Sequence, residues 1–139
     1  MNLNRRRPRN QQGVMLLEAL IGILIFSIGI LALLGMQATA MRATIDAKYR
    51  SEASFLANEI IGTMWVDRAN LSLYQSDCAG HTECNAWLTR VQAILPNATG
   101  GNAPTIVVVG QQATVTLFWQ RPGDSTVSNH VVVAQINNT

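Results

Sequence analysis

The sequence predicts an α+β protein in which one long N-terminal helix precedes a small antiparallel β-sheet and packs on it. Two observations predict this order. No proline occurs between Pro8 and Pro96, so nothing in that span forbids a continuous helix. After Pro104 the chain contains three runs rich in β-branched residues, separated by turn signals. With 139 residues, the chain has room for one compact domain beside a membrane segment.

The first thirteen residues are basic. They contain Arg5, Arg6, Arg7 and Arg9 and no acidic residue. The formal net charge of the whole chain is +2, yet acidic residues outnumber basic ones beyond residue 13. A basic tail in front of an apolar run predicts that the N-terminus stays in the cytoplasm, with the chain crossing the membrane once. We therefore expect these arginines to set membrane orientation and not to bind nucleic acid.

Residues 14–36 read as a membrane-spanning helix, with Glu18 as their only charged residue. At about 1.5 Å per residue the segment would reach roughly 34 Å, enough to cross a bilayer core. A secretory signal peptide has a shorter apolar region with a small-residue cleavage site after it, and here the small residues at Ala38–Ala40 come late. A simple single-pass anchor is the other alternative. Neither explains Glu18, because a carboxylate in a membrane helix by default indicates a functional partner.

Helical spacing continues through residues 37–66, so the predicted helix spans about residues 14–66. Small or apolar residues recur there at steps of three and four, which predicts one stripe along the helix. We expect this stripe to face the protein's own head domain, because small side chains let a sheet approach closely. Its members are Ala40, Ala43, Ala47, Ser51, Ser54, Ala57, Ile61 and Met64.

The segment 67–96 combines a polar loop with a short helix. Residues 67–83 are turn-rich, residues 84–95 have apolar side chains at helical spacing, and Pro96 ends the helix. Cys78 and Cys84 suit a small disulfide loop if the segment is exported. Two reduced thiols in a cytosolic loop are the alternative. Zinc is disfavoured, because His81 and Glu83 are the only nearby ligand types and their spacing is not that of a common zinc site.

The C-terminal part predicts a sheet. Residues 97–104 read as a loop, and strands are expected over 105–110, 113–120 and 130–136, with a turn signal at 121–125. The predicted sheet, over residues 105–136, lies on the C-terminal half of the long helix. No enzyme signature, metal site or cofactor motif is found, and His81 and His130 are expected to be structural or solvated. We therefore expect a protein that is not an enzyme.

The N-terminal pattern resembles a known export signal. An arginine-rich leader, then Gly13, then VMLLEALIGILIFSIGILALLG is similar to the class III signal of type IV pilins and type II secretion pseudopilins. The resemblance implies that prepilin peptidase cleaves after Gly13, removes residues 1–13 and methylates the new amine of Val14. Leu16 matches the usual leucine. Two positions depart from the pattern, since Val14 stands where the family usually has Phe and Met15 where it often has Thr or Ser.

The same resemblance implies a role for Glu18, which would become the fifth residue of the processed chain. In the family this carboxylate is thought to pair with the N-terminal amine of a neighbouring subunit in the filament. Burying either charge alone would be costly, and the pairing offsets that cost. Glu18 is therefore expected to hold the register of subunits during assembly. The family also implies a pilin-like head over residues 37–139.

Residues 35–71 are similar to one group of minor pilins, the type IV pilus modification proteins or PilV group, and the resemblance covers roughly residues 13–70. Met36-Gln37, Ala40 and Arg42 match the start of that group's pattern and Arg68-Ala69-Asn70 its end. The resemblance implies a minor pilin that initiates pilus assembly within a complex at the pilus tip. Expected partners are prepilin peptidase, other minor pilins, the major pilin, the inner-membrane assembly platform and a tip adhesin. Before assembly the chain would lie in the inner membrane with its C-terminus in the periplasm.

Two alternatives stay open at this point. The first is a minor pseudopilin at the tip of a type II secretion system, because the LLEALI motif does not separate the two filaments. The second is a bitopic membrane-anchored binding module unrelated to filaments. That module would need only the apolar span and the head, with Gly13 and Glu18 present by coincidence.

Overall fold

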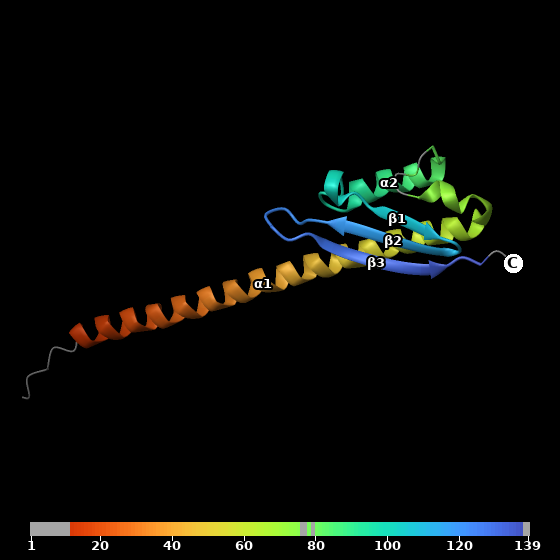
Figure 1. Cartoon of the computed structure of the whole chain (residues 1–139). Coiled ribbons are helices and arrows are strands. Elements are labelled where there is room, and N and C mark those ends of the chain that lie inside the picture. The colour runs from red at the N-terminus through yellow and green to blue at the C-terminus, as the bar shows by residue number, and fades with distance from the viewer. Residues whose placement is uncertain (1–11, 76–77, 79, 138–139) are drawn as a thin grey trace, which may run out of the picture. The chain divides into compact units, whose positions relative to one another are not determined.

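The computed structural model describes residues 12–75, 78 and 80–137 of the chain (Figure 1). The four leader arginines lie outside the described residues. The chain divides into two compact units, with the boundary between Thr44 and Ile45. Helix α1 (Gln12–Val66) is one continuous helix that contributes to both units. Each unit is described by itself below.

The N-terminal unit consists of the first part of α1. Its helix begins at Gln12, two residues before the predicted start. Every side chain described from residue 13 to residue 44 is exposed, including all of the large apolar ones in the predicted membrane segment. This unit therefore has no hydrophobic core of its own within the described residues. Its stability in water cannot come from burial, which is the main source of helical stability in soluble proteins.

The C-terminal unit has a core into which the second half of α1 packs. The residues that α1 buries in this core include Leu56, Ile60 and Met64. The predicted stripe is only partly right: Ala57, Ile61 and Met64 are buried and Ser54 is half-buried, while Ala47 and Ser51 are exposed. The earlier members, Ala40 and Ala43, are exposed as well. No residue of α1 described before residue 46 is even half-buried, so the early members of the stripe have no core to face.

The segment after α1 is more regular than the sequence predicts. In place of a plain loop, the 3-10 helix η1 (Arg68–Tyr74) follows α1 after the single residue Asp67, and non-helical backbone angles at Asn70 interrupt it. It forms because the buried side chain of Tyr74 ties this segment to the core. A second short 3-10 helix, η2 (Gly100–Asn102), lies within residues 97–104, which were also predicted as a loop.

Helix α2 (Thr82–Ile94) packs against α1. It buries Cys84, Trp87 and Val91, and the indole nitrogen of Trp87 donates a hydrogen bond to the carbonyl oxygen of Leu56 over 2.8 Å. The helix ends where the sequence predicts a stop. Leu95 is its C-cap, and Pro96 cannot continue a helical hydrogen-bond ladder.

The sheet has three antiparallel strands in the order β1 (Thr105–Val109), β2 (Gln112–Trp119) and β3 (Ser128–Gln135). The central strand β2 alternates strictly, because every second residue faces the core. Val115 lies opposite Ile106 on one side and Val132 on the other. Figure 1 shows the sheet and α2 beside the second half of α1. The prediction of a long apolar helix followed by a small antiparallel sheet is therefore confirmed.

Candidate functional site

The predicted cleavage site lies at the very start of α1. Gly13 and Val14 are in its first turn, where backbone N–H groups have no partner inside the helix. The side chains that follow are open, with Val14 66% and Met15 71% exposed. By length and composition alone, α1 is long and apolar enough to cross a membrane, and it is the one such helix in the described part of the chain.

Glu18 lies one helical turn after Val14, so the two residues share a face of α1. Only one other side chain between residues 14 and 36 is polar, and this is Ser27. The hydroxyl of Ser27 donates to the carbonyl oxygen of Ile23 over 2.7 Å, which satisfies it within the helix. Among the described residues no hydrogen bond or ion pair reaches Glu18. Any partner for its carboxylate therefore lies outside the described residues.

The predicted disulfide is present. Cys78 and Cys84 are bonded, with 5.3 Å between their Cα atoms, and both are fully buried. The bridge closes the turn that leads into α2, where the backbone N–H of His81 donates to the carbonyl oxygen of Cys78 over 2.8 Å. The side-chain amide of Asn85 donates to the same oxygen over 3.2 Å. Neither cysteine is a free thiol, and the residues that the structure describes gather no set of three metal ligands.

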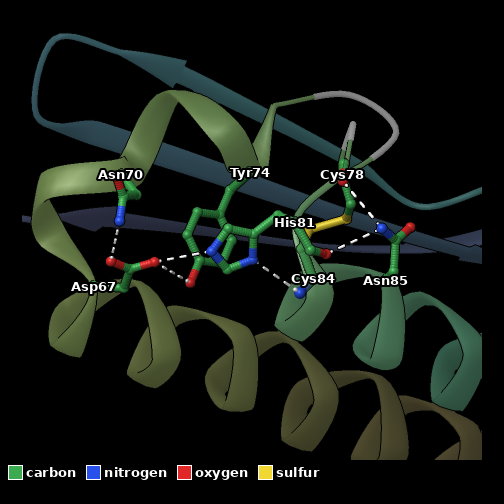
Figure 2. A network of polar contacts seen from close by, with 7 residues as sticks. All are labelled: Asp67, Asn70, Tyr74, Cys78, His81, Cys84 and Asn85. Carbon is green, nitrogen blue, oxygen red and sulfur yellow. Dashed lines mark hydrogen bonds and ion pairs between the residues drawn. A yellow bond between two sulfur atoms is a disulfide. The ribbon is translucent and has the colours of Figure 1, made fainter.

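His81 caps the N-terminus of α2, and its neighbours determine its tautomer (Figure 2). The backbone N–H of Cys84 donates to Nδ1 of His81 over 3.3 Å, so Nδ1 must be unprotonated. The ring proton of a neutral imidazole is then on Nε2, which lies 2.9 Å from Oδ2 of Asp67 and donates to it. A single ring therefore joins the start of α2 to the residue that follows α1.

Asp67 is the centre of this network. The Tyr74 hydroxyl donates to Oδ2 over 3.1 Å, and the Asn70 side-chain amide donates to Oδ1 over 2.7 Å. These bonds favour the carboxylate, so the pKa of Asp67 is lowered, first by the Asn70 bond and then by the His81 bond. Burial, followed by the hydrogen bond to Asp67, raises the pKa of Tyr74 to about 12. The network ties α1, η1 and α2 together at the end of the head.

The two histidines differ in their environment. His81 is a structural side chain, one of the two outcomes expected from the sequence, and its ring also lies 4.3 Å from that of Tyr74 between centroids. His130 is half-buried on β3, and its Nε2 has no hydrogen-bond partner among the described atoms. Sequence reasoning missed Asp67, Asn70 and Tyr74 as a network. The only signal that pointed to this region was the pair of cysteines beside His81.

A surface groove of about 700 Å³ opens beside the network. Its lining includes Gly62 and Val66 of α1 and the carboxylates of Glu59, Asp67 and Glu83. Two of these carboxylates already have partners in the head, since Glu59 pairs with Arg90 over 2.5 Å and Asp67 with His81. The groove therefore does not present a cluster of free acids.

Comparison of the chain with models of protein families, with curated proteins and with solved structures finds no match. Function is therefore inferred from the residues and their geometry.

Proposed function

We propose that the protein is a minor pilin, which prepilin peptidase processes at Gly13–Val14 and which takes part in initiating type IV pilus assembly within a tip-located complex. The observation that carries the proposal is Glu18. It is the only charge in residues 14–36, and it stands among exposed apolar side chains one turn after the predicted new N-terminus. The cytoplasmic leader arginines and the disulfide in the head support an orientation with the head in an oxidising compartment.

The physical reason is the cost of an isolated carboxylate in an apolar environment. Inside a bundle of apolar helices, Glu18 would need an opposite charge to remain ionised. The amine of Val14 on a neighbouring subunit supplies one, and methylation leaves that amine cationic. A charge-assisted hydrogen bond of this kind is stronger than a neutral one and fixes the axial register between neighbouring helices. A simple anchor has no use for the carboxylate.

The first experiment is intact-mass spectrometry of the protein extracted from membranes. We expect a chain that begins at Val14 and carries one additional methyl group. The matched control is the same gene expressed in a strain without prepilin peptidase, in which the mass should correspond to the full chain. An uncut Met1 start in cells that contain the peptidase would refute the proposal.

The second experiment tests Glu18 itself. Glu18→Ala should leave membrane insertion unchanged and abolish incorporation into filaments, measured by immunoblotting of membrane and sheared-filament fractions. Glu18→Asp, which keeps the charge, should restore part of the incorporation. Glu52→Ala removes an acid from the same helix outside the apolar segment and should incorporate normally. If Glu18→Ala is incorporated into filaments normally, Glu18 does not hold the register between subunits.

A minor pseudopilin is the second candidate, since the N-terminal pattern fits both filaments. Deletion of the gene separates the two. Loss of surface pili with normal protein secretion is expected for a minor pilin, whereas loss of secretion with normal pili would identify a pseudopilin. If pili and secretion are both normal and the chain is never cleaved, both filament candidates are wrong, and a membrane-anchored binding module is the remaining interpretation.

A further inference from the structure

His81 makes two hydrogen bonds that only one protonation state of its ring can keep. Nδ1 accepts from the backbone N–H of Cys84 over 3.3 Å, and Nε2 lies 2.9 Å from Oδ2 of Asp67 (Figure 2). A neutral ring with its proton on Nε2 satisfies both contacts. A protonated ring is a donor at both nitrogens, so Nδ1–H would then face another N–H group. Addition of one proton therefore breaks the bond to Cys84 and keeps the bond to Asp67.

The bond to Asp67 becomes stronger when the ring is protonated. A hydrogen bond between a charged imidazolium and a carboxylate is roughly twice as strong as a neutral one. Asp67 stays ionised at the pH where histidines titrate, because the bonds from Asn70 and then His81 lower its pKa. Tyr74, whose ring packs on that of His81, stays neutral there, because burial and then the bond to Asp67 raise its pKa to about 12. The ring is therefore attached to the residue after α1 in both states.

The backbone N–H of Cys84 depends on this one acceptor. It lies in the first turn of α2, where an N–H group has no carbonyl partner inside the helix. Cys84 is also fully buried. A buried donor that loses its acceptor is costly, so protonation of His81 favours a shift of this turn that brings the N–H group to water.

The turn before α2 is held together by contacts that do not involve the His81 ring. The disulfide joins Cys78 to Cys84. The side-chain amide of Asn85 donates to the carbonyl oxygen of Cys78 over 3.2 Å and to that of His81 over 3.0 Å. These contacts are the same in both protonation states of the ring. The turn therefore keeps its own shape while its attachment to Asp67 changes.

Protons reach the ring through the surface groove beside α1. The His81 side chain is 12% exposed and lines this groove with two acids besides Asp67, namely Glu59 of α1 and Glu83 of α2. Glu59 is balanced by its ion pair with Arg90, whereas Glu83 is exposed in the first turn of α2. Among the lining residues that the structure describes, none is Lys or Arg. The charges along the groove therefore favour uptake of a proton by the ring.

We propose that His81 is a proton-controlled latch on α2. The neutral ring caps the helix, and a proton taken from solvent onto Nδ1 releases the first turn of α2 while the ring stays bound to Asp67. Histidine is the side chain whose charge ordinarily changes between about pH 5 and 8. Release reshapes the groove, because His81 and Glu83 both line it. The latch lies in the head and goes beyond the proposed function, since it does not depend on cleavage or methylation of the N-terminus.

The test follows the full chain in detergent by NMR from about pH 8 to about pH 5, the range in which histidine titrates. Nitrogen-15 shifts of the His81 ring give the pH midpoint of its protonation. Across that midpoint, the protection factor of the Cys84 amide against hydrogen exchange should fall about tenfold or more. The Val91 amide lies deeper in α2 and should keep its protection. Equal loss at both amides would mean that acid loosens the whole head and that no latch exists.

Matched variants assign the transition to the ring. His81→Asn keeps a capping acceptor that takes up no proton, so the Cys84 amide should stay protected over the whole pH range. Asp67→Asn is the second variant, should the first not fold. It keeps the ring and removes the facing charge, and the midpoint should move about one pH unit or more toward acid. His130→Gln removes the other histidine of the sequence and should keep the transition. Asp77 lies outside the described residues, and Asp77→Asn should also keep it.

Three further results would overturn the proposal. The first is a Cys84 amide that keeps its protection while the ring titrates, because the cap would then survive protonation. The second is the same loss of protection in His81→Asn, because another group would then cause it. The third is a ring that stays neutral down to about pH 5, where most histidines are charged. None of these results bears on the mass of the processed N-terminus, so a failure here is distinguishable from a failure of the proposed function.

Discussion

Trp87 of α2 donates its indole N–H to the carbonyl oxygen of Leu56 in α1, and this buried bond of 2.8 Å joins two helices that are 31 residues apart in the sequence. Leu56 lies in the middle of a helix, so its carbonyl oxygen also accepts a helical hydrogen bond. The indole therefore adds a bond without leaving either group unsatisfied. It fixes the position of α2 on α1 and, through the disulfide, that of the turn before α2.

Replacement of this indole should weaken the head. Trp87→Phe removes the bond and some volume, and we expect it to lower the free energy of unfolding by about 1–2 kcal/mol. Trp65→Phe is the matched control, because Trp65 is exposed and its replacement should change stability by less than about 0.5 kcal/mol. Urea unfolding followed by circular dichroism in detergent measures both. An equal loss of unfolding free energy in the two variants would show that the hydrogen bond from Trp87 to Leu56 does not stabilise the head.

The tautomer of His81 leads to a second prediction. Nitrogen-15 NMR should show Nε2 protonated and Nδ1 unprotonated at neutral pH, since Nδ1 accepts from the Cys84 N–H. His81→Ala removes both the cap and the bond to Asp67 and should cost about 1–3 kcal/mol of stability. His81→Asn restores a good capping side chain and should recover part of that loss. If His81→Asn is as unstable as His81→Ala, the cap contributes nothing.

Alkaline pH should destabilise the head through Tyr74. Its pKa is raised from 10.0 to about 12 in the folded state, so the folded protein holds the phenolic proton more tightly than the unfolded chain does. The resulting stability is fully present below pH 10 and is lost as the pH rises through about 12. Unfolding free energies from neutral pH to pH 12 should fall more steeply for the native chain than for Tyr74→Phe.

Asp67→Asn provides the control for this pH dependence. Burial is the first cause of the raised pKa of Tyr74, and the hydrogen bond to Asp67 is the second. Loss of the carboxylate should therefore bring the pKa of Tyr74 only part of the way back toward 10.0, as followed by tyrosinate absorbance. A complete return would show that Asp67, and not burial, is the main cause.

Reduction of the disulfide should weaken the same region. Cys78 and Cys84 are six residues apart, and closing so short a loop stabilises a fold by about 2 kcal/mol in the chain-entropy view. Treatment with dithiothreitol should lower the unfolding free energy by about that amount and raise the mass by two hydrogens. The Cys78→Ser/Cys84→Ser variant should be insensitive to the reagent. Unchanged mass after reduction of an oxidised preparation would mean that the bridge does not form.

Much of the fold follows from local pattern. The absence of proline and the long apolar run predict α1, Pro96 predicts the end of α2, and strict alternation predicts β2. These signals suffice because backbone geometry and side-chain periodicity act over a few residues. The pairing of Cys78 with Cys84 was also predictable, since the chain contains no other cysteine.

The face that α1 buries was predicted only in part. Small residues suggested a stripe that includes Ala47 and Ser51, yet the helix buries Leu56 and Ile60 instead. Which side of a helix becomes buried, and over what length, depends on where the sheet and α2 pack, and that placement is not encoded in the spacing of small residues. The 3-10 helix η1 was missed for a related reason, because Tyr74 is ordered by its burial and not by the polar residues around it.

The sequence by itself determined the N-terminal pattern of Gly13, Val14 and Glu18, the order of helix and strands, and the cysteine pair. These features depend on residue type and spacing along one segment. Only the tertiary structure decided that Asp67 meets His81 across fourteen residues and that Gln75 bonds to the carbonyl oxygen of Val108 on β1. The physical reason is that a hydrogen bond needs its donor and acceptor at about 3 Å, and residues far apart in the sequence reach that distance only through the packing of the whole head.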